Sequence, residues 1–111
     1  MELLKPSFEQ LVEEIVAVNR AWKVARDLFD EPSPLATSLR DLKLCKQVRL
    51  LQNYAPELVY LALDPASKGE ALYSLRLREP IGDRQNAEHL PVRVAEEVLS
   101  PEELRRLVAV D

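Results

Sequence analysis

The chain has 111 residues, of which 47% are hydrophobic and 31% are charged, and its formal net charge is −4. These values predict one small folded domain over residues 1–111 and exclude a wholly disordered chain. Aromatic residues make up only 5% of the chain, so the core must consist mostly of Leu and Val. With two glycines, the sequence also argues against a protein built on Gly-rich phosphate loops.

The cellular compartment is indicated by the single cysteine, Cys45, which has no partner for an intramolecular disulfide. The N-terminal segment MELLKPSFEQ has neither the basic region nor the apolar run of a signal peptide. No stretch approaches the ~18 uninterrupted apolar residues of a membrane span. We therefore expect a cytoplasmic protein without membrane contact.

The first predicted element is a long amphipathic helix over residues 7–29. Ser7 and Gln10 have the spacing of a capping box, and seven apolar residues then recur at alternating spacings of three and four: Phe8, Leu11, Ile15, Val18, Trp22, Ala25 and Phe29. Such a repeat drifts by about 20° per heptad on a straight helix. The late stripe is widened by Ala21, Val24 and Leu28. We therefore expect Phe8 and Ile15 in the core, and these three later residues in a second contact with a partner.

A second helix is predicted from either Ser33-Pro34 or Ser38, where Asp41 completes a capping box, to about Asn53. Its expected buried stripe is Leu42, Cys45, Val48 and Leu51, whereas Leu35 and Leu39 lie elsewhere on the wheel. Opposite much of this stripe runs a basic ridge at i+3 spacing, formed by Arg40, Lys43, Lys46 and Arg49. This ridge has three interpretations: a solvated face, a surface for an acidic protein, or a phosphate-contacting surface for nucleic acid. The sequence pI of about 5.1 disfavours nucleic acid.

The next forty residues predict a β-hairpin. The apolar run over 57–63 is typical of a central strand buried on both faces, and residues 71–78 alternate like a half-exposed strand. A helix over 68–79 is the alternative, because Ser67 and Glu70 have capping-box spacing. Residues 80–90 are expected to form an exposed loop with a turn at Gly82-Asp83.

Two short helices are expected at the C-terminus. The segment VRVAEEVL after Pro91 is predicted to be helical, and Ser100-Pro101-Glu102-Glu103 has the composition of a helix start. Leu104, Leu107 and Val108 form the packing face of the last helix. The predicted fold is therefore α+β: two N-terminal helices, a β-hairpin or small antiparallel sheet, and short C-terminal helices.

The residues that could perform chemistry do not combine into a recognisable site. His89 is the only histidine and has no predicted partner to orient it, so we expect a surface loop histidine. Cys45 shares its stripe with Leu42 and Val48, which predicts a buried thiol. Neighbouring glutamates on a helix diverge by about 100° and cannot face one substrate together. We therefore predict no catalytic residue, no metal ligand and no cofactor.

The sequence favours a non-enzymatic protein-interaction module, such as an adaptor or small regulator. It would act through the amphipathic helix and an open sheet edge, because a lone hairpin needs another strand or a packed helix. The partner would be another protein or a second copy in a homodimer, and the predicted contact residues are Ala21, Val24, Leu28, Arg40, Lys43, Lys46 and Arg49. The alternative is a nucleic-acid-associated regulator that uses the basic ridge, and a third hypothesis is a small enzyme with a site assembled from scattered residues.

Overall fold

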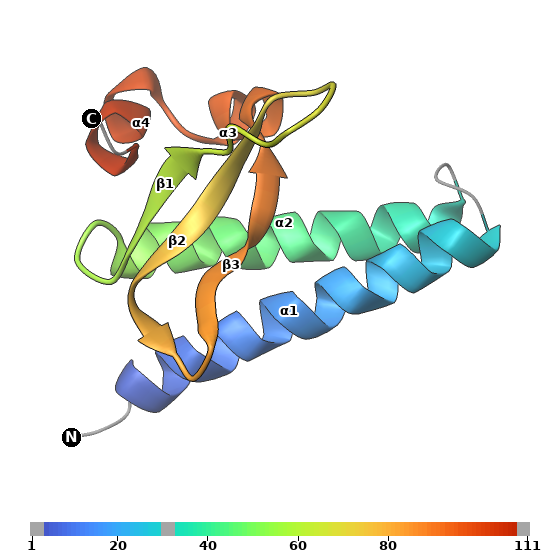
Figure 1. The fold of residues 1–111 in the computed structure, drawn as a ribbon, viewed down its shortest axis with the longest axis horizontal. Helices are drawn as coiled ribbons and strands as arrows, with labels where there is room; N and C mark the ends of the chain where they lie inside the picture. The colour runs from blue at the N-terminus through green and yellow to red at the C-terminus, as the bar shows by residue number, and fades with distance from the viewer. Residues whose placement is uncertain (1–3, 30–32, 109–111) are drawn as a thin grey trace. The chain divides into compact units, whose positions relative to one another are not determined.

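The computed structural model describes residues 4–29 and 33–108 and confirms the α+β class (Figure 1). Its elements are α1 (Leu4–Phe29), α2 (Pro34–Tyr54), β1 (Val59–Leu63), β2 (Leu72–Ile81), β3 (Arg84–Pro91), α3 (Val92–Val98) and α4 (Pro101–Leu107). The chain divides into two compact units, Met1–Leu50 with the helical hairpin and Leu51–Asp111 with the sheet. None of the described helices has the length and apolarity needed to cross a membrane.

Helix α1 begins at Leu4, so the prediction that Ser7 starts it is wrong. A proline is compatible with the first turn of a helix, because the N–H that it lacks has no partner there, and Pro6 therefore does not delay the start. Gln10 donates instead to Glu14, with Nε2 3.3 Å from Oε2. The buried apolar residues lie mostly in the first half of the helix, and they are Phe8, Leu11, Val12, Ile15, Val16 and Ala25.

Helix α2 starts at the first of its two predicted positions. The backbone N–H of Ala36 donates to Ser33 Oγ at 3.1 Å, which makes Ser33 the N-cap and places Pro34 at the first helical position. Of the predicted buried stripe, Leu51 is buried and Val48 half-buried, but the prediction is wrong for Cys45, which is exposed, and for Leu42, which is 45% exposed. The buried residues are Ala36, Lys43, Gln47, Leu50 and Leu51. The pattern of apolar residues indicated the wrong face of α2, because two positions of the buried face carry the polar side chains of Lys43 and Gln47.

The sheet is antiparallel with the order β1-β2-β3, so residues 72–81 form a strand and not the alternative helix. β2 is the central strand, contrary to the expectation that 57–63 would be central. β1 is also not buried on both faces, because Val59 and Leu61 are buried on one face while Tyr60 and Ala62 on the other are only half-buried. The predicted alternation of β2 is confirmed for Tyr73, Leu75 and Leu77, which are buried, and for the exposed Arg76 and Arg78. Ser74 departs from it, because it belongs to the face predicted to be exposed but is buried.

Strand β3 replaces the predicted loop over 80–90, although the turn at Gly82-Asp83 is present. Gly82 has a φ of +60°, which suits the first central position of a two-residue hairpin turn. Ser74 pairs with His89 and Arg76 pairs with Asn86, so two residues of β3 oppose one residue of β2. This is a β-bulge, and it includes Glu88 at a φ of +66°.

The bulge explains why the sequence did not predict β3 as a strand. A regular strand would send residues 87 and 90 to opposite faces, because successive side chains alternate. The extra residue restores both to one face, where Ala87 and Leu90 are fully buried. An apolar spacing of three, in an otherwise polar segment, does not match the period of two that indicates a strand.

The two C-terminal helices are confirmed. Ser100 caps α4 in the predicted manner: its Oγ accepts from the backbone N–H of Glu103 at 3.1 Å, and Glu103 Oε1 accepts from the backbone N–H of Ser100 at 2.9 Å. The reciprocal pair satisfies two N–H groups that a helix start leaves without helical partners. Leu107 is buried, and Val108 forms an isolated parallel bridge with Leu61 of β1.

Candidate functional site

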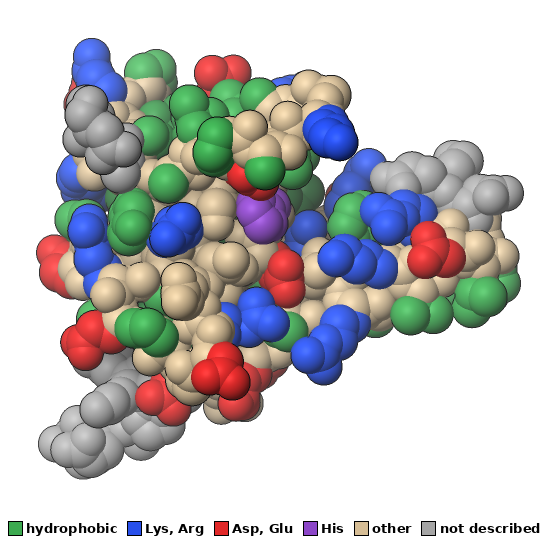
Figure 2. Space-filling model, viewed as in Figure 1, with side chains coloured by type: hydrophobic (Ala, Val, Ile, Leu, Met, Phe, Trp, Pro, Cys, Tyr) green, Lys and Arg blue, Asp and Glu red, His purple; other side chains and the backbone are tan. Residues whose placement is uncertain are grey.

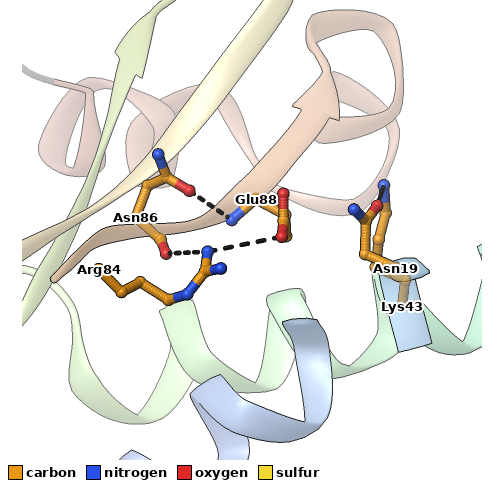
Figure 3. Close-up of polar contacts among 5 residues, drawn as sticks. All are labelled: Asn19, Lys43, Arg84, Asn86 and Glu88. Atoms are coloured by element: carbon orange, nitrogen blue, oxygen red, sulfur yellow. Dashed lines mark hydrogen bonds and ion pairs between the residues drawn. The ribbon is translucent and has the colours of Figure 1, made fainter. Parts of the chain in front are cut away.

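Polar side chains join α1 to α2 along the helical hairpin. Lys43 is only 6% exposed; its Nζ donates to Oδ1 of the buried Asn19 at 3.2 Å (Figure 3) and lies 4.5 Å from the ring centroid of Trp22. One turn away, Lys46 Nζ lies 2.9 Å from Glu14 Oε1. These contacts hold two of the four predicted ridge cations within the hairpin.

The basic ridge is therefore divided by the fold. Arg40 and Arg49 are exposed, Lys46 is partly buried in its ion pair, and Lys43 is buried. A cation whose charged end is already paired in a buried setting must break that pair to reach a phosphate or a carboxylate outside. The interpretation of all four residues as one solvated face is wrong for Lys43.

An apolar groove lies at the turn end of the same hairpin. We call it the hairpin groove; it is lined chiefly by Ala21, Val24, Leu28 and Phe29 of α1 and by Leu35 and Leu39 of α2. Arg20 and the buried Ala25 complete the lining. Figure 2 shows hydrophobic side chains at the surface of the hairpin beside its turn, with Lys and Arg side chains over the same part.

The large side chains of the hairpin groove are unusually exposed. The exposed fraction is 69% for Leu28, 56% for Val24, 56% for Phe29 and 50% for Leu35. A single exposed leucine is ordinary, whereas a contiguous apolar patch is the kind of surface on which another molecule can pack. The three α1 residues predicted to form a second contact all line this groove.

The sequence did not predict the rest of the groove. Phe29 was assigned to the buried seam of α1 but is exposed, because the helix ends there. Leu35 and Leu39 were set apart from the buried stripe of α2, and their i, i+4 spacing was the signal for a second apolar face. Arg20, the charged residue of the lining, was not among the predicted contact residues.

A polar cluster surrounds the bulge of β3. Arg84 Nη1 donates to the carbonyl of Asn86 at 3.2 Å and lies 3.5 Å from Glu88 Oε2, while the backbone N–H of Glu88 donates to Asn86 Oδ1 at 3.0 Å (Figure 3). All three residues lie within five positions of one strand, so the cluster is local to the bulge. The cluster accounts for the positive φ of Glu88 as a structural feature of the bulge.

His89 lies in β3 and not in a loop, and its Nε2 is 3.3 Å from Asp64 Oδ2. Burial raises the pKa of Tyr73, and the negative charge of Glu96 acts in the same direction, so this phenol stays protonated at neutral pH.

Among residues 4–29 and 33–108, no group of three or more His, Cys, Asp or Glu side chains is placed to hold a metal ion. Comparisons with protein families, with curated proteins and with solved structures found no match to this chain.

Proposed function

We propose that the protein is a non-enzymatic, cytoplasmic protein-interaction module that binds an apolar helix of a protein partner in the hairpin groove. The observation that carries the proposal is the exposure of Val24, Leu28, Phe29 and Leu35 around one groove. Grooves between helices commonly receive an amphipathic helix through apolar residues spaced at i, i+3/i+4 and i+7. Burying such side chains removes apolar surface from water, which is the main favourable contribution to most protein association.

The chemistry of the groove supports binding in preference to catalysis. Its lining is aliphatic or aromatic except for Arg20, whose side chain has hydrogen-bond donors and no acceptor. General acid–base catalysis requires a group that gains and loses a proton near the working pH. The lining offers shape and apolar surface, which are the properties of a recognition site.

Other surfaces support a function less well. The basic ridge, on which the nucleic-acid alternative depends, has Lys43 buried and Lys46 paired with Glu14. The sheet edge at β3 is interrupted by the bulge at Glu88, and bulges at edges hinder the addition of another strand. The proposal therefore rests on the helical hairpin and not on the sheet.

The test is a charge placed in the groove. Because Val24 is exposed, Val24→Arg should change the free energy of unfolding by less than about 0.5 kcal/mol, and it should abolish partner binding. The matched control is Leu63→Arg, which places the same charge on a similarly exposed residue of β1, at 62% against 56% for Val24. A photo-crosslinking amino acid at position 24 or 28 should form adducts in the native cell, and one at position 63 should not.

Two results would contradict the proposal. If Val24→Arg unfolds the protein in urea titrations, the groove is a part of the core. If positions 24 and 28 give no more adducts than position 63, the groove contacts no partner.

A further inference from the structure

One row of exposed side chains on α1 has the pattern of a helix-pairing seam. Ala17, Ala21, Val24 and Leu28 follow one another at spacings of four, three and four, and all four are exposed. This 3.5-residue repeat is the one that lets two helices pack side by side over several turns. The side chains grow from alanine to leucine toward the C-terminal end, so the row is narrow at one end and bulky at the other.

We propose that the partner helix in the hairpin groove is α1 of a second copy, packed antiparallel about a two-fold axis. This inference rests on the proposed function, since it names the occupant of the same groove. An antiparallel pair sets Ala21 against Val24 of the second copy, and Ala17 against Leu28 of the second copy. Each small residue then meets a large one, and a two-fold axis provides each of these contacts twice.

A parallel pairing lacks this complementarity. It would place alanine beside alanine at one end and Leu28 beside Leu28 at the other, so the helices could not stay in contact along the whole row. Packing that leaves voids forfeits dispersion contacts on both sides of each gap. The size gradient therefore selects the antiparallel orientation.

The charges beside the row agree with the same orientation. Glu13, Arg20 and Asp27 are exposed and seven residues apart, so they form one flank of the seam. In the antiparallel pair, Arg20 faces Asp27 of the second copy, and the symmetry repeats the ion pair. Within its own chain, Asp27 contacts Arg26 at 3.6 Å with 74% of its side chain exposed, which leaves it open to a second cation.

The size of the patch predicts a weak dimer. A stable interface buries roughly 800 Å² on each partner, whereas the largest apolar patch of an ordinary monomer covers roughly 300–600 Å². The groove and the row offer four large side chains that are about half exposed or more, which are few anchors for an interface of the first size. We expect a reversible dimer with a dissociation constant of roughly 10 µM to 1 mM, which is formed at high local concentration.

The experiment measures the mass of the full chain by sedimentation equilibrium from about 5 to 500 µM. The mass should rise from 12.7 kDa toward twice that value. Arg20→Asp and Asp27→Arg should each weaken the dimer at least threefold, and the double variant should restore it to within about twofold. Lys23→Asp is the matched control for the first change, because Lys23 is exposed on the same helix but lies off the seam.

Each other outcome overturns the inference. A mass of one chain at every concentration excludes the dimer, and a dimer that neither charge change affects is formed by another surface. Photo-crosslinking at position 24 separates this failure from that of the proposed function. An adduct of twice the chain mass supports the dimer. An adduct with a different protein overturns the dimer but supports the proposed function. The absence of any adduct contradicts both proposals.

Discussion

Lys43 shows how a single contact can reverse the interpretation of a residue. Because Arg40 and Lys46 lie three positions before and after it, the sequence placed Lys43 in an exposed basic ridge. Lysine is rarely buried unless its charge is paired, so its burial could not be expected from the ridge alone. Its partners, Asn19 and Trp22, are on α1, more than twenty positions away in the chain. No local pattern encodes such a pairing, so the face of α2 that is buried could not be predicted from the sequence.

We expect Lys43→Ala to lower the free energy of unfolding by about 1–3 kcal/mol, because it leaves the buried Asn19 carbonyl without this donor. Urea unfolding measures the change. Lys23→Ala, at an exposed site on α1, should have an effect below about 0.5 kcal/mol. The double variant Asn19→Leu, Lys43→Met should recover most of the loss, since both polar groups are then removed; a single Lys43→Ala variant as stable as the parent would contradict the role of this pair.

The helices and strands that the sequence predicted correctly are those whose pattern lies within the element itself. The apolar repeat of α1, the alternation of β2 and the cap of α4 are local patterns, and all three elements are present. β3 was missed because its bulge breaks the period of two, and the stripe of α2 was wrong because its apolar residues occupy more than one face. The three apolar residues predicted for the second contact do line the groove, because the drift of the α1 repeat is itself a local property.

The α1–α2 pair has an acid-sensitive contact at Glu14. The hydrogen bond from Lys46 lowers the pKa of Glu14 below its ordinary value of 4.5, and the charge of Lys46 and the hydrogen bond from Gln10 act in the same direction against the effect of burial. A carboxyl with a lowered pKa in the folded state stabilises the fold above its unfolded pKa. This stabilisation is lost as the pH falls through the folded pKa.

Glu14→Gln should therefore lower the free energy of unfolding at pH 7, by under about 1 kcal/mol for so exposed a pair. The difference from the parent should shrink as the pH falls below about 4.5 and disappear below the lowered pKa. Urea titrations at several pH values measure this difference. Glu13→Gln, at an exposed position, is the control, and an effect of Glu14→Gln that is the same at pH 7 and at pH 3 would contradict the ion pair.

At the scale of the whole molecule, charge is distributed unevenly along the chain. Residues 20–49 contain seven basic and four acidic residues, whereas residues 57–111 contain eleven acidic and seven basic residues. The overall charge of −4 repels phosphate backbones at long range. The basic segment does not offset this repulsion, because Lys43 and Lys46 are held in contacts with α1.

We therefore expect no binding to duplex DNA or single-stranded RNA tighter than about 100 µM at physiological salt, the weak end of non-specific affinity. Fluorescence anisotropy with labelled oligonucleotides measures it. Arg40→Glu and Arg49→Glu should leave the titrations unchanged. Micromolar binding that weakens steeply as salt increases, and that these two variants abolish, would instead support a nucleic-acid-associated regulator.

The bridge between Leu61 and Val108 has a consequence for the fate of the unfolded chain. Residues 58–63, LVYLAL, are apolar and have no charge, no proline and no glycine, which are features of segments that stack into cross-β fibrils. In the fold, β1 is paired with β2 along its length, and Val108 occupies its other edge at Leu61. Val108 therefore covers part of the β1 edge at which a strand of another chain could otherwise pair.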